Sequence, residues 1–348
     1  MSHAAEKGDL FLAEDLQRLS QSILEAVGTP VDLAAIVAAS LVDANLAGHD
    51  SHGVIRLPSY VASVRDGRVI ASARAERHSL GGACARVDGG RGWGQPAARL
   101  AVDTALDIAS NEGVALVAIG RCNHIGRLGE YVERLSQQGK MGVVICNSPA
   151  AVAPYGGYTR LLGTNPIAWS APTRPGSPPV MVDFATATIA EGKLRVAQAS
   201  GGKAPAGAVV DSGGRPNEDP AAFYDGGALT TFGGHKGFGL SVMAELMGGI
   251  LSGSQPSSLP GYDNGNGTVM LAIDVERFVP LADFLDQAEA FSDRVRGAPP
   301  APGFSEVMMP GEPESNSRKR RLAEGVPVPA ATYQAIIDTA SELGLNRV

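Results

Sequence analysis

An alternation of apolar and amphipathic segments between residues 84 and 147 most constrains the fold of this chain. The stretch that begins ARVDGG predicts a strand followed by a glycine-rich turn. A helix is then predicted from Gln95 to Asn111, and an apolar strand from Val114 to Ile119. A second helix, Leu128 to Gln138, leads into a buried strand, Met141 to Asn147. Strands that alternate with helices in this way are typical of α/β units, so a mixed α/β core is expected.

Both ends of the chain have helical periodicity. Apolar residues recur at helical intervals from Leu10 to Val27, and a Thr-Pro pair then provides the start of a second helix that ends near Ala47. Another helix is expected from Val54 to Arg65. The last predicted helix runs from about Pro329 to Leu343.

The middle of the chain gives weaker signals. Residues 149–234 are rich in glycine and proline, so strands and ordered loops are expected there. One strong helix follows, from about Phe238 to Ile250. Residues 252–266 and 297–303 have the composition of exposed loops. The basic run Arg318 to Arg321 is predicted to be a solvated helix turn.

Length and composition exclude several classes of protein. At 348 residues the chain is expected to form more than one domain, because single cores rarely grow beyond about 250 to 300 residues. The 36 acidic residues outnumber the 29 basic ones, so no nucleic-acid partner is expected. No segment approaches the ~20 apolar residues of a membrane span, and no signal peptide is recognised, so a soluble cytoplasmic protein is expected. Three cysteines without C-x-x-C spacing indicate neither a disulfide framework nor a thiolate zinc site.

The segment AGHDSHGVIRLPSY, residues 47–60, concentrates groups that could perform proton transfer. His52 stands beside Ser51 after a glycine-broken helix, and histidine exchanges protons near neutral pH. The alternative is that the two histidines of this segment bind helix-end carbonyls. If a helix resumes after the turn, Arg56 lies one turn beyond His52 on the same face. Its guanidinium would then suit a substrate that carries a carboxylate beside a hydroxyl or carbonyl group.

Two glycine-containing segments precede predicted helices. In CNHIGRLGEY, residues 122–131, His124 ends an apolar strand, and free N–H groups at the following helix start would attract a phosphate; a packing turn with a core histidine is the alternative. In TFGGHKGFGLSVMAELMGG, residues 231–249, glycines surround His235 and Lys236, and a lysine offers a point charge for phosphate. No strand is followed by G-x-G-x-x-G, so a dinucleotide is not expected to bind in the usual Rossmann manner.

Three further segments are weak as single motifs. GTNPIAWSAPT, residues 163–173, and VDFATATIAEGK, residues 182–193, place polar groups beside strand-like apolar residues, as a pocket lining would. Asp183 could accept hydrogen bonds from ribose hydroxyls or simply cap a turn. MPGEPE, residues 309–314, is likewise either part of a pocket or a simple turn.

Together and in this order, the segments resemble the family of type 2 malate/L-lactate dehydrogenases. The marks of that family are D-S-H-G-x-x-R-x-P-x-Y, N/S-H-x-G, G-T-N-P, D-x-A-T, G-G-H-K-G and a late P-G-E. The corresponding residues here are Asp50–Tyr60, Asn123–Gly126, Gly163–Pro166, Asp183–Thr186, Gly233–Gly237 and Pro310–Glu312. The match extends over nearly the whole chain, and the details ANLAGHDSHG and HIGRLG are most similar to the hydroxycarboxylate dehydrogenase branch.

The resemblance implies an oxidoreductase that uses NAD or NADP to interconvert a 2-hydroxy acid and a 2-oxo acid. It implies a homodimer, a mixed sheet in a non-Rossmann NAD(P)-binding domain, and a helical domain built from both termini. On this basis residues 1–120 and 315–348 are expected to form the substrate and dimerisation part. Residues 121–314 are expected to form the NAD(P)-binding domain.

The same resemblance implies residue roles. His52 would exchange a proton with the substrate oxygen, with Ser51 hydrogen-bonded to it. Arg56 would hold the substrate carboxylate, and Thr164 and Lys193 would lie near the substrate. The residues implied to line the cofactor are His124, Ile125, Gly126, Arg127, Leu128, Asp183, Phe184, Ala185, His235, Lys236, Pro310, Gly311 and Glu312. No metal site is expected.

Departures from the family pattern leave alternatives open. Ala187 replaces the serine that usually follows D-x-A-T, which removes one hydroxyl. Some members that reduce cyclic imino acids have an aspartate where Lys193 stands, and this argues against an imine reductase acting on a cyclic 2-carboxylate. A non-catalytic nucleotide-binding protein is a further alternative, and the presence of both His52 and Arg56 argues against it. A metal hydrolase with His49, Asp50 and His52 as ligands is another, and the lack of an H-E-x-x-H motif argues against it. A 2′-phosphate of NADP could meet Arg127, Arg160 or Lys236.

Overall fold

A mixed β-sheet forms the centre of the molecule. The structure is a computed structural model that describes residues 8–199 and 201–345. The seven strands of the sheet are, in spatial order, β2 (Glu76–Gly81), β3 (Cys84–Asp88), β4 (Val114–Gly120), β11 (Thr268–Asp274), β5 (Lys140–Cys146), β6 (Ile167–Ala171) and β7 (Val180–Phe184). Neighbouring strands are antiparallel except for β3 and β4, which are parallel.

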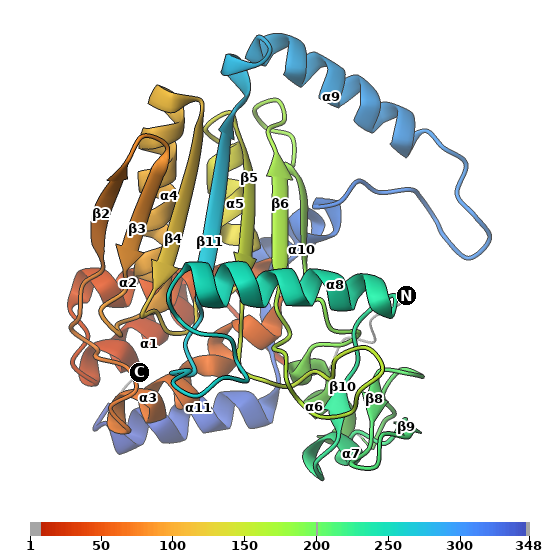
Figure 1. Ribbon diagram of the computed structural model, residues 1–348. Coiled ribbons are helices and arrows are strands. Elements are labelled where there is room, and N and C mark those ends of the chain that lie inside the picture. The colour runs from red at the N-terminus through yellow and green to blue at the C-terminus, as the bar shows by residue number, and fades with distance from the viewer. Residues whose placement is uncertain (1–7, 200, 346–348) are drawn as a thin grey trace.

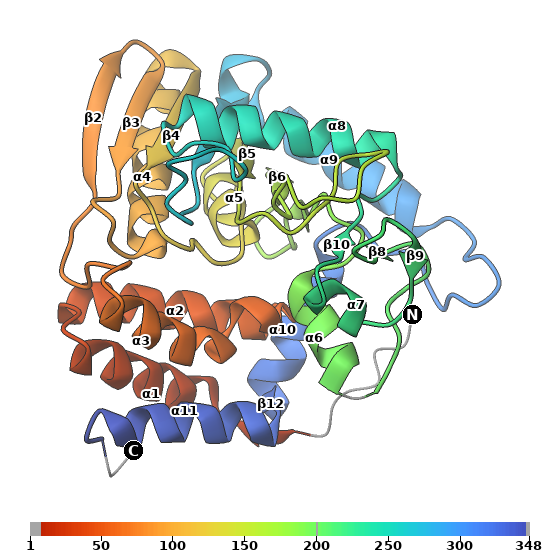
Figure 2. The same ribbon diagram turned by 60° about the horizontal axis from the view of Figure 1, so that its bottom comes forward.

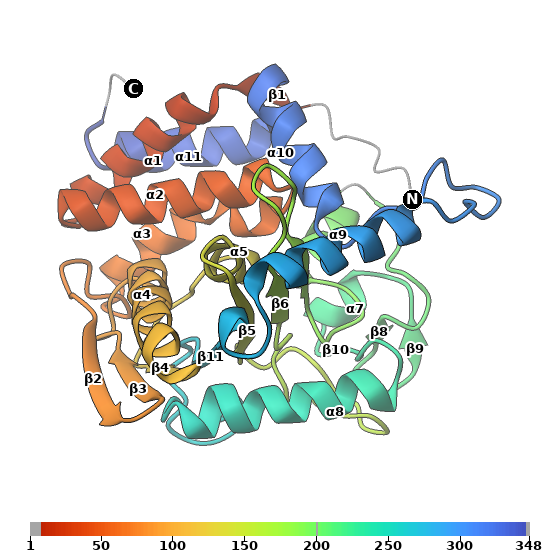
Figure 3. The same cartoon turned by 90° about the horizontal axis from the view of Figure 1, so that it is seen from above.

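Helices cover parts of both faces of this sheet (Figure 1). α4 (Gly94–Glu112) and α5 (Gly129–Ser136) lie on one face. α8 (His235–Ala244), continued by the π-helix Glu245–Leu251, crosses the other face. Seen from above, the terminal helices, the α4 and α5 pair, the sheet and α8 follow one another as layers (Figure 3).

Small side chains allow α4 to lie close to the sheet. Ala98, Ala101 and Ala105 of α4 are fully buried, and the helix contacts β3, β4 and β11. On the strand side, Val117 pairs with Met270, and both are fully buried. Apolar surface buried on this scale is the main stabilising contribution to the fold.

The first and last helices form a second layer beside the sheet (Figure 2). They are α1 (Ala13–Ala26), α2 (Val31–Leu46), α3 (Leu57–Arg65) and α11 (Ala330–Glu342). Their shared apolar core includes the fully buried side chains of Leu41 and Ile336. β1 (Asp9–Phe11) pairs antiparallel with β12 (Val326–Val328), so an early and a late segment of the chain meet in this layer.

A smaller unit lies beside one end of the sheet (Figure 1). It consists of α6 (Glu191–Ala199), α7 (Ala221–Tyr224), β8 (Val209–Val210), β9 (Pro216–Asn217) and β10 (Ala228–Leu229). Its core includes Val152, Leu194 and Phe223.

α9 (Leu281–Arg296) projects from the body, and α10 (Glu312–Glu324) returns to the terminal helices. In the described ranges, no helix has the length and apolar character needed to cross a membrane.

The mixed α/β fold with helices contributed by both termini, as predicted, is confirmed. The helices and strands predicted between residues 84 and 147 are present as β3, α4, β4, α5 and β5. The division at residue 120 stays a prediction. The central sheet contains strands from both sides of that residue.

Several helices and strands were not predicted from the sequence. Residues 149–234 were expected to contain strands and loops alone, and this is wrong because α6 lies there and buries Leu194 in the smaller unit. The central strand β11 and the helices α9 and α10 are not identified from the pattern either. α10 has no buried residue and lacks the apolar stripe that periodicity detects. α9 does carry such a stripe, with Leu281, Phe284 and Ala288 at helical intervals, so its periodicity could have indicated it.

Candidate active site

Two 3-10 turns after α2 carry Ser51, His52 and Arg56, with the extended residue Gly53 between the turns. The chain therefore does not continue as a single helix through this segment. Arg56 folds back, and its Nε donates to the carbonyl oxygen of Ser51 at 2.6 Å. Ser51 Oγ lies 3.0 Å from His52 Nδ1. This contact occupies one ring nitrogen of His52 and leaves Nε2 as the nitrogen that can face a substrate. We call residues 50–56 the catalytic turn.

A second histidine lies against the first. The rings of His52 and His124 stack, with centroids 5.5 Å apart, and Gly126 turns the chain after His124 with a φ of +78°. His124 Nδ1 lies 2.7 Å from Tyr60 Oη. Gln95 Nε2 donates to the same Tyr60 oxygen at 2.8 Å. Because Tyr60 Oη already accepts from Gln95, its own O–H is free to donate to His124 Nδ1.

Burial and neighbouring cations keep both imidazoles neutral. Burial, followed by the charges of Arg56 and His49, lowers the pKa of His52 to about 3. Burial and then Arg56 hold the pKa of His124 well below its ordinary value. Burial raises the pKa of Tyr60 to about 12, so its phenol stays protonated. At neutral pH the free site therefore offers a proton acceptor on His52, whereas the Tyr60 hydroxyl keeps the proton that it donates to His124.

The first turn of α6 packs against the catalytic turn. A Cβ atom added to Gly192 would lie 2.8 Å from Ser51 Cβ, so only glycine permits this approach. Lys193, the next residue of α6, is exposed. Lys193 thus directly follows a residue that packs on Ser51, and its contact with the substrate stays a prediction.

Hydrogen bonds join three of the predicted segments. The carbonyl oxygen of Thr164 accepts from the backbone N–H of Thr186 at 2.9 Å and from its Oγ1 at 3.0 Å. The carbonyl oxygen of Thr186 accepts from Phe232 N at 3.0 Å. Thr164 Oγ1 also lies 3.1 Å from Ser148 Oγ. The G-T-N-P, D-x-A-T and G-G-H-K-G segments therefore lie together, although they are distant in sequence.

Asp183 connects this group to the loop that carries His124. Gly129 N donates to Asp183 Oδ2 at 2.7 Å, so this carboxylate caps the first turn of α5. The neighbouring Phe184 meets Phe232 edge-on, with centroids 5.6 Å apart. Ala185 packs against the core of the smaller unit. The capping role that the sequence leaves open for Asp183 is therefore present, and a ribose contact stays a prediction.

Three side chains of the predicted cofactor loop point into the protein. Ile125, Arg127 and Leu128 are 1%, 2% and 1% exposed. Arg127 Nη2 lies 3.0 Å from Asp43 Oδ2 and 2.8 Å from Glu133 Oε2. A ligand can therefore meet these three residues through their backbone, because the side chains are committed to the interior.

The start of α8 has the features of an anion site. Gly233 and Gly234 precede it with φ of +58° and +60°, a conformation that favours glycine. His235 and Lys236 follow in the first turn and are exposed. The His235 ring meets Tyr155 edge-on at 6.0 Å. The backbone N–H groups of Lys236, Gly237 and Phe238 donate to carbonyl oxygens of residues 232–234, so the ammonium group of Lys236 is the feature here that suits a phosphate.

The late P-G-E segment forms the turn before α10. Met181 N donates to the carbonyl oxygen of Pro310 at 3.1 Å, which fixes the turn to β7. Gly311 has a φ of +95°. Glu312 Oε2 accepts from Met309 N at 2.7 Å, so its carboxylate stabilises the turn itself. A cofactor contact by these residues stays a prediction.

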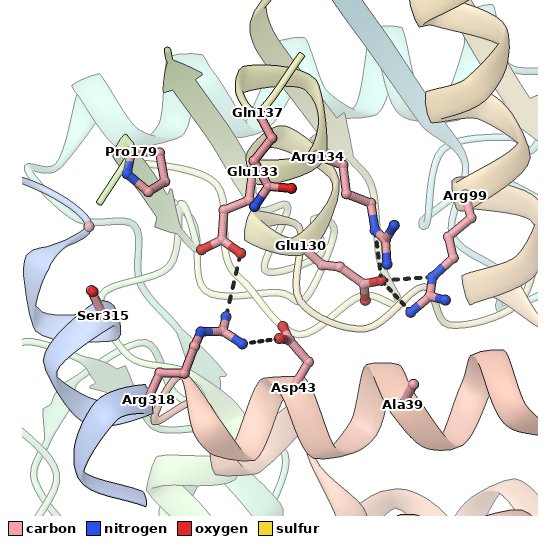
Figure 4. A pocket seen from close by; sticks show the side chains of 11 residues that line it. Ala39, Asp43, Arg99, Glu130, Glu133, Arg134, Gln137, Pro179, Ser315 and Arg318 are labelled. Carbon is pink, nitrogen blue, oxygen red and sulfur yellow. Dashed lines mark hydrogen bonds and ion pairs between the residues drawn. The ribbon is translucent and has the colours of Figure 1, made fainter. Parts of the chain in front are cut away.

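A cavity of about 440 Å³ lies between α2, α5 and α10 (Figure 4). Arg318 lies between Asp43 and Glu133 at one end, and two arginines meet Glu130 at the other. Of the predicted site residues, Gly311 lines this cavity. Its acidic and basic side chains pair with one another. The catalytic turn, rather than this cavity, therefore brings the predicted chemistry together.

Tyr60, the partner of His124, and Gln95, the partner of Tyr60, were not identified from the sequence. Tyr60 is the last residue of the D-S-H-G-x-x-R-x-P-x-Y segment, so its place in the motif could have indicated it. Gln95 stands at the start of α4, and nothing in the local pattern connects it with Tyr60. Within residues 8–199 and 201–345, no three or more His, Cys, Asp or Glu side chains are grouped to hold a metal ion.

Comparisons of the chain with known proteins identify its family. The model of a family described as malate/L-lactate dehydrogenase matches residues 11–337. The chain belongs to this family. Membership in the malate/L-lactate dehydrogenase family confirms the resemblance seen in the sequence motifs and makes the protein an oxidoreductase of the dehydrogenase class.

Relatives in the family carry different names. Hydroxycarboxylate dehydrogenase B from Escherichia coli is 35% identical over 98% of this chain and 96% of its own length. The Delta(1)-pyrroline-2-carboxylate/Delta(1)-piperideine-2-carboxylate reductase of Pseudomonas syringae pv. tomato is 33% identical over 97% of this chain and 98% of its own. The structure of malate dehydrogenase from Pyrococcus horikoshii superposes with a TM-score of 0.91 at 29% identity, covering 100% of this chain and 99% of that one.

The lowered pKa of His52 predicts a pH dependence of stability. The pKa is about 3 in the folded protein against 6.5 for an ordinary histidine, so below pH 6.5 the unfolded chain binds a proton that the folded one does not. The free energy of unfolding should therefore fall as the pH falls from 6.5 towards 3. In His52→Gln, calorimetry should give a Tm that falls less over this window than in the wild type. His78→Gln, an exposed histidine on β2, is the control; equal slopes for all three proteins would contradict the prediction.

Proposed function

We propose that this protein interconverts a 2-hydroxy acid and a 2-oxo acid with NAD or NADP as the hydride carrier. The observation that carries the proposal is the catalytic turn, where Ser51 orients His52 and Arg56 stands one 3-10 turn away. The Nη atoms of Arg56 make no hydrogen bond to another described residue. A carboxylate can therefore bind this guanidinium while the oxygen on C2 faces His52.

His52 provides the proton transfer in this proposal. In the oxidation of a hydroxy acid, neutral Nε2 accepts the hydroxyl proton, and Ser51 at Nδ1 holds the ring in place. In the reverse direction His52 must carry a proton. A substrate carboxylate beside Arg56 would offset the positive field that lowers the pKa of His52, and so favour the protonated form. The stacked His124, hydrogen-bonded to Tyr60, supports the ring from its other side.

The exposed start of α8 fits a dinucleotide phosphate, because a glycine turn with positive φ leads directly to Lys236. When bound there, a nicotinamide cofactor supplies or accepts the hydride at C2. Residues 121–314 would be the part that holds it. Of the side chains that could meet a 2′-phosphate, Arg127 is committed to ion pairs and Arg160 to the carbonyl oxygens of Gly227 and Phe223. Lys236 is therefore our candidate for that contact.

An imine reductase is the second candidate, because a relative with that name is 33% identical over nearly the whole chain. The exposed Lys193, which directly follows the glycine that packs on Ser51, favours an anionic hydroxy acid or oxo acid instead. The two candidates share a carboxylate on the reacting carbon, so Arg56 would serve either one.

The reaction is tested by NADH or NADPH absorbance with pyruvate, oxaloacetate, phenylpyruvate, 4-hydroxyphenylpyruvate and Δ1-piperideine-2-carboxylate. We expect oxidation of the cofactor with at least one oxo acid. His52→Ala should lower kcat by about 10² to 10⁴, the usual contribution of a general acid–base group. His78→Ala serves as the control. Turnover of the imine alone would move the function to imine reduction, and full activity of His52→Ala would remove the role given to His52.

Replacing Arg56 separates substrate binding from cofactor binding. Arg56→Ala should raise KM for the oxo acid by about 10 to 100-fold, the loss of a charged hydrogen bond. Arg56→Lys keeps the positive charge but loses the two-pronged guanidinium geometry, so its KM for the oxo acid should lie between those of the wild type and Arg56→Ala. Initial rates over a range of both substrates give the two KM values. A larger effect on the cofactor KM than on the oxo acid KM would contradict the assignment.

We also propose that the protein is a homodimer that associates through α8, which lies outside the residues 1–120 and 315–348 that are expected from the sequence to form the dimerisation part. Met243, Leu246, Ile250 and Leu251 on α8 and its π-helical continuation are between 45% and 57% exposed. Apolar groups exposed together in this way are typical of subunit contacts. Light scattering after size exclusion should give the mass of two chains, and Ile250→Glu should give the mass of one. Leu322→Glu, at a similarly exposed site on α10, should stay dimeric; a monomeric wild type would refute the proposal.

A further inference from the structure

α10 binds the rest of the molecule through one charged face. Glu314, Arg318 and Arg321 follow one another at intervals of four and three residues, so they lie on the same side of the helix. All three meet the segment that ends α2 and begins the catalytic turn. Glu314 Oε1 lies 3.5 Å from His49 Nε2, and Arg318 forms an ion pair with Asp43. The basic run predicted to be solvated therefore has an inward face, whereas Lys319 and Arg320 are exposed.

The contact of Arg321 is the most specific of these. Its Nη1 lies 2.6 Å from Asp50 Oδ1, and its Nη2 lies 3.0 Å from Asp50 Oδ2, a two-pronged pairing that fixes both groups. Nη1 also donates to the carbonyl oxygen of Asn45. The Arg321 side chain is 11% exposed. A guanidinium held in this way has one orientation, because each partner constrains the same plane.

Asp50 passes this constraint to the catalytic turn. It directly precedes Ser51, and it also accepts from Asn45 Nδ2 at 2.6 Å. Asn45 Oδ1 accepts from Val54 N at 2.9 Å, on the far side of His52. Asn45 and Asp50 therefore hold the turn before and after the histidine. Arg321 binds both of them.

We infer that Arg321 is a positioning residue for His52, acting through Asp50, and that α10 fixes the catalytic turn relative to the turn at residues 310–312. The inference rests on the proposed function, in which His52 transfers the proton. The first turn of α10 has its own anchor, because Arg296 Nε donates to Glu312 Oε1 at 2.6 Å. One rigid helix thus connects the predicted cofactor side of the site to the proton-transfer side.

A purely stabilising ion pair is the competing explanation, and the second anchor of α10 allows the two to be separated. Arg318 lies between Asp43 and Glu133 (Figure 4), so α10 keeps its attachment to α2 and α5 when Arg321 is replaced. A variant at Arg321 should therefore fold. Its defect should lie in the geometry of His52, where a displacement of about 1 Å can lower the rate about 100-fold.

The first experiment compares Arg321→Met, Arg321→Lys and the control Arg320→Met in the full chain. Arg321→Met should lower kcat by about 10 to 100-fold, while KM for NADH or NADPH stays within about twofold. Arg321→Lys restores one charged contact without the fork, so its kcat should be intermediate. Arg320→Met should match the wild type. If Arg321→Met keeps wild-type kcat and loses only Tm, Arg321 is merely structural and the inference is wrong.

The second experiment does not need turnover. Diethyl pyrocarbonate modifies neutral imidazoles, and peptide mass spectrometry gives the rate at His52 alone. In Arg321→Met the catalytic turn loses its anchor, so the rate of modification at His52 should rise several-fold. In Arg320→Met this rate should equal that of the wild type. Equal rates in both variants would overturn the inference. If the wild type reduces none of the acids, the proposed function fails, and the modification rates still decide the role of Arg321.

Discussion

The pairing of β11 with both β4 and β5 is the interaction on which the rest of the structure depends. It joins strands that the chain reaches more than a hundred residues apart, and it brings their connecting loops together. Asn266, just before β11, accepts from Ile125 N at 3.2 Å and donates to the carbonyl oxygen of Asn147 at 2.8 Å. The loop that carries His124 is therefore held by the entry to the central strand. A site assembled from loops is only as ordered as the sheet from which those loops emerge.

Charged side chains join the helical layer to α5, which lies on the sheet. Arg127 is almost fully buried, and its burial is compensated by Asp43 from α2 and Glu133 from α5. Arg318 joins the same two carboxylates from α10. Removing one partner of such a group leaves a buried charge without compensation, which costs more than the pair contributes. The layers on either side of the site are thus joined by a small number of strongly directional contacts.

The sequence predicts those elements and site residues that are specified by short segments of the chain. The β3-α4-β4-α5-β5 order and the terminal helices follow from periodicity and turn residues, and Ser51, His52 and Arg56 follow from one short motif. β11 and the partners of the catalytic turn could not be predicted, because each forms contacts with residues far away in the sequence. Arg321 illustrates the limit: its basic neighbours favour a solvated face, and only the packing of α10 against Asp50 shows that it points inward.

The meeting of β1 and β12 has a consequence for how the protein is made. Leu41 in the second helix and Ile336 in the last one share a core, and Asp9 aligns with Val328. During synthesis the first helices leave the ribosome long before their final partners exist. The part of their apolar surface that β12 and α11 cover stays exposed until those two elements emerge, so this layer is completed late in synthesis, when chaperones have most to protect.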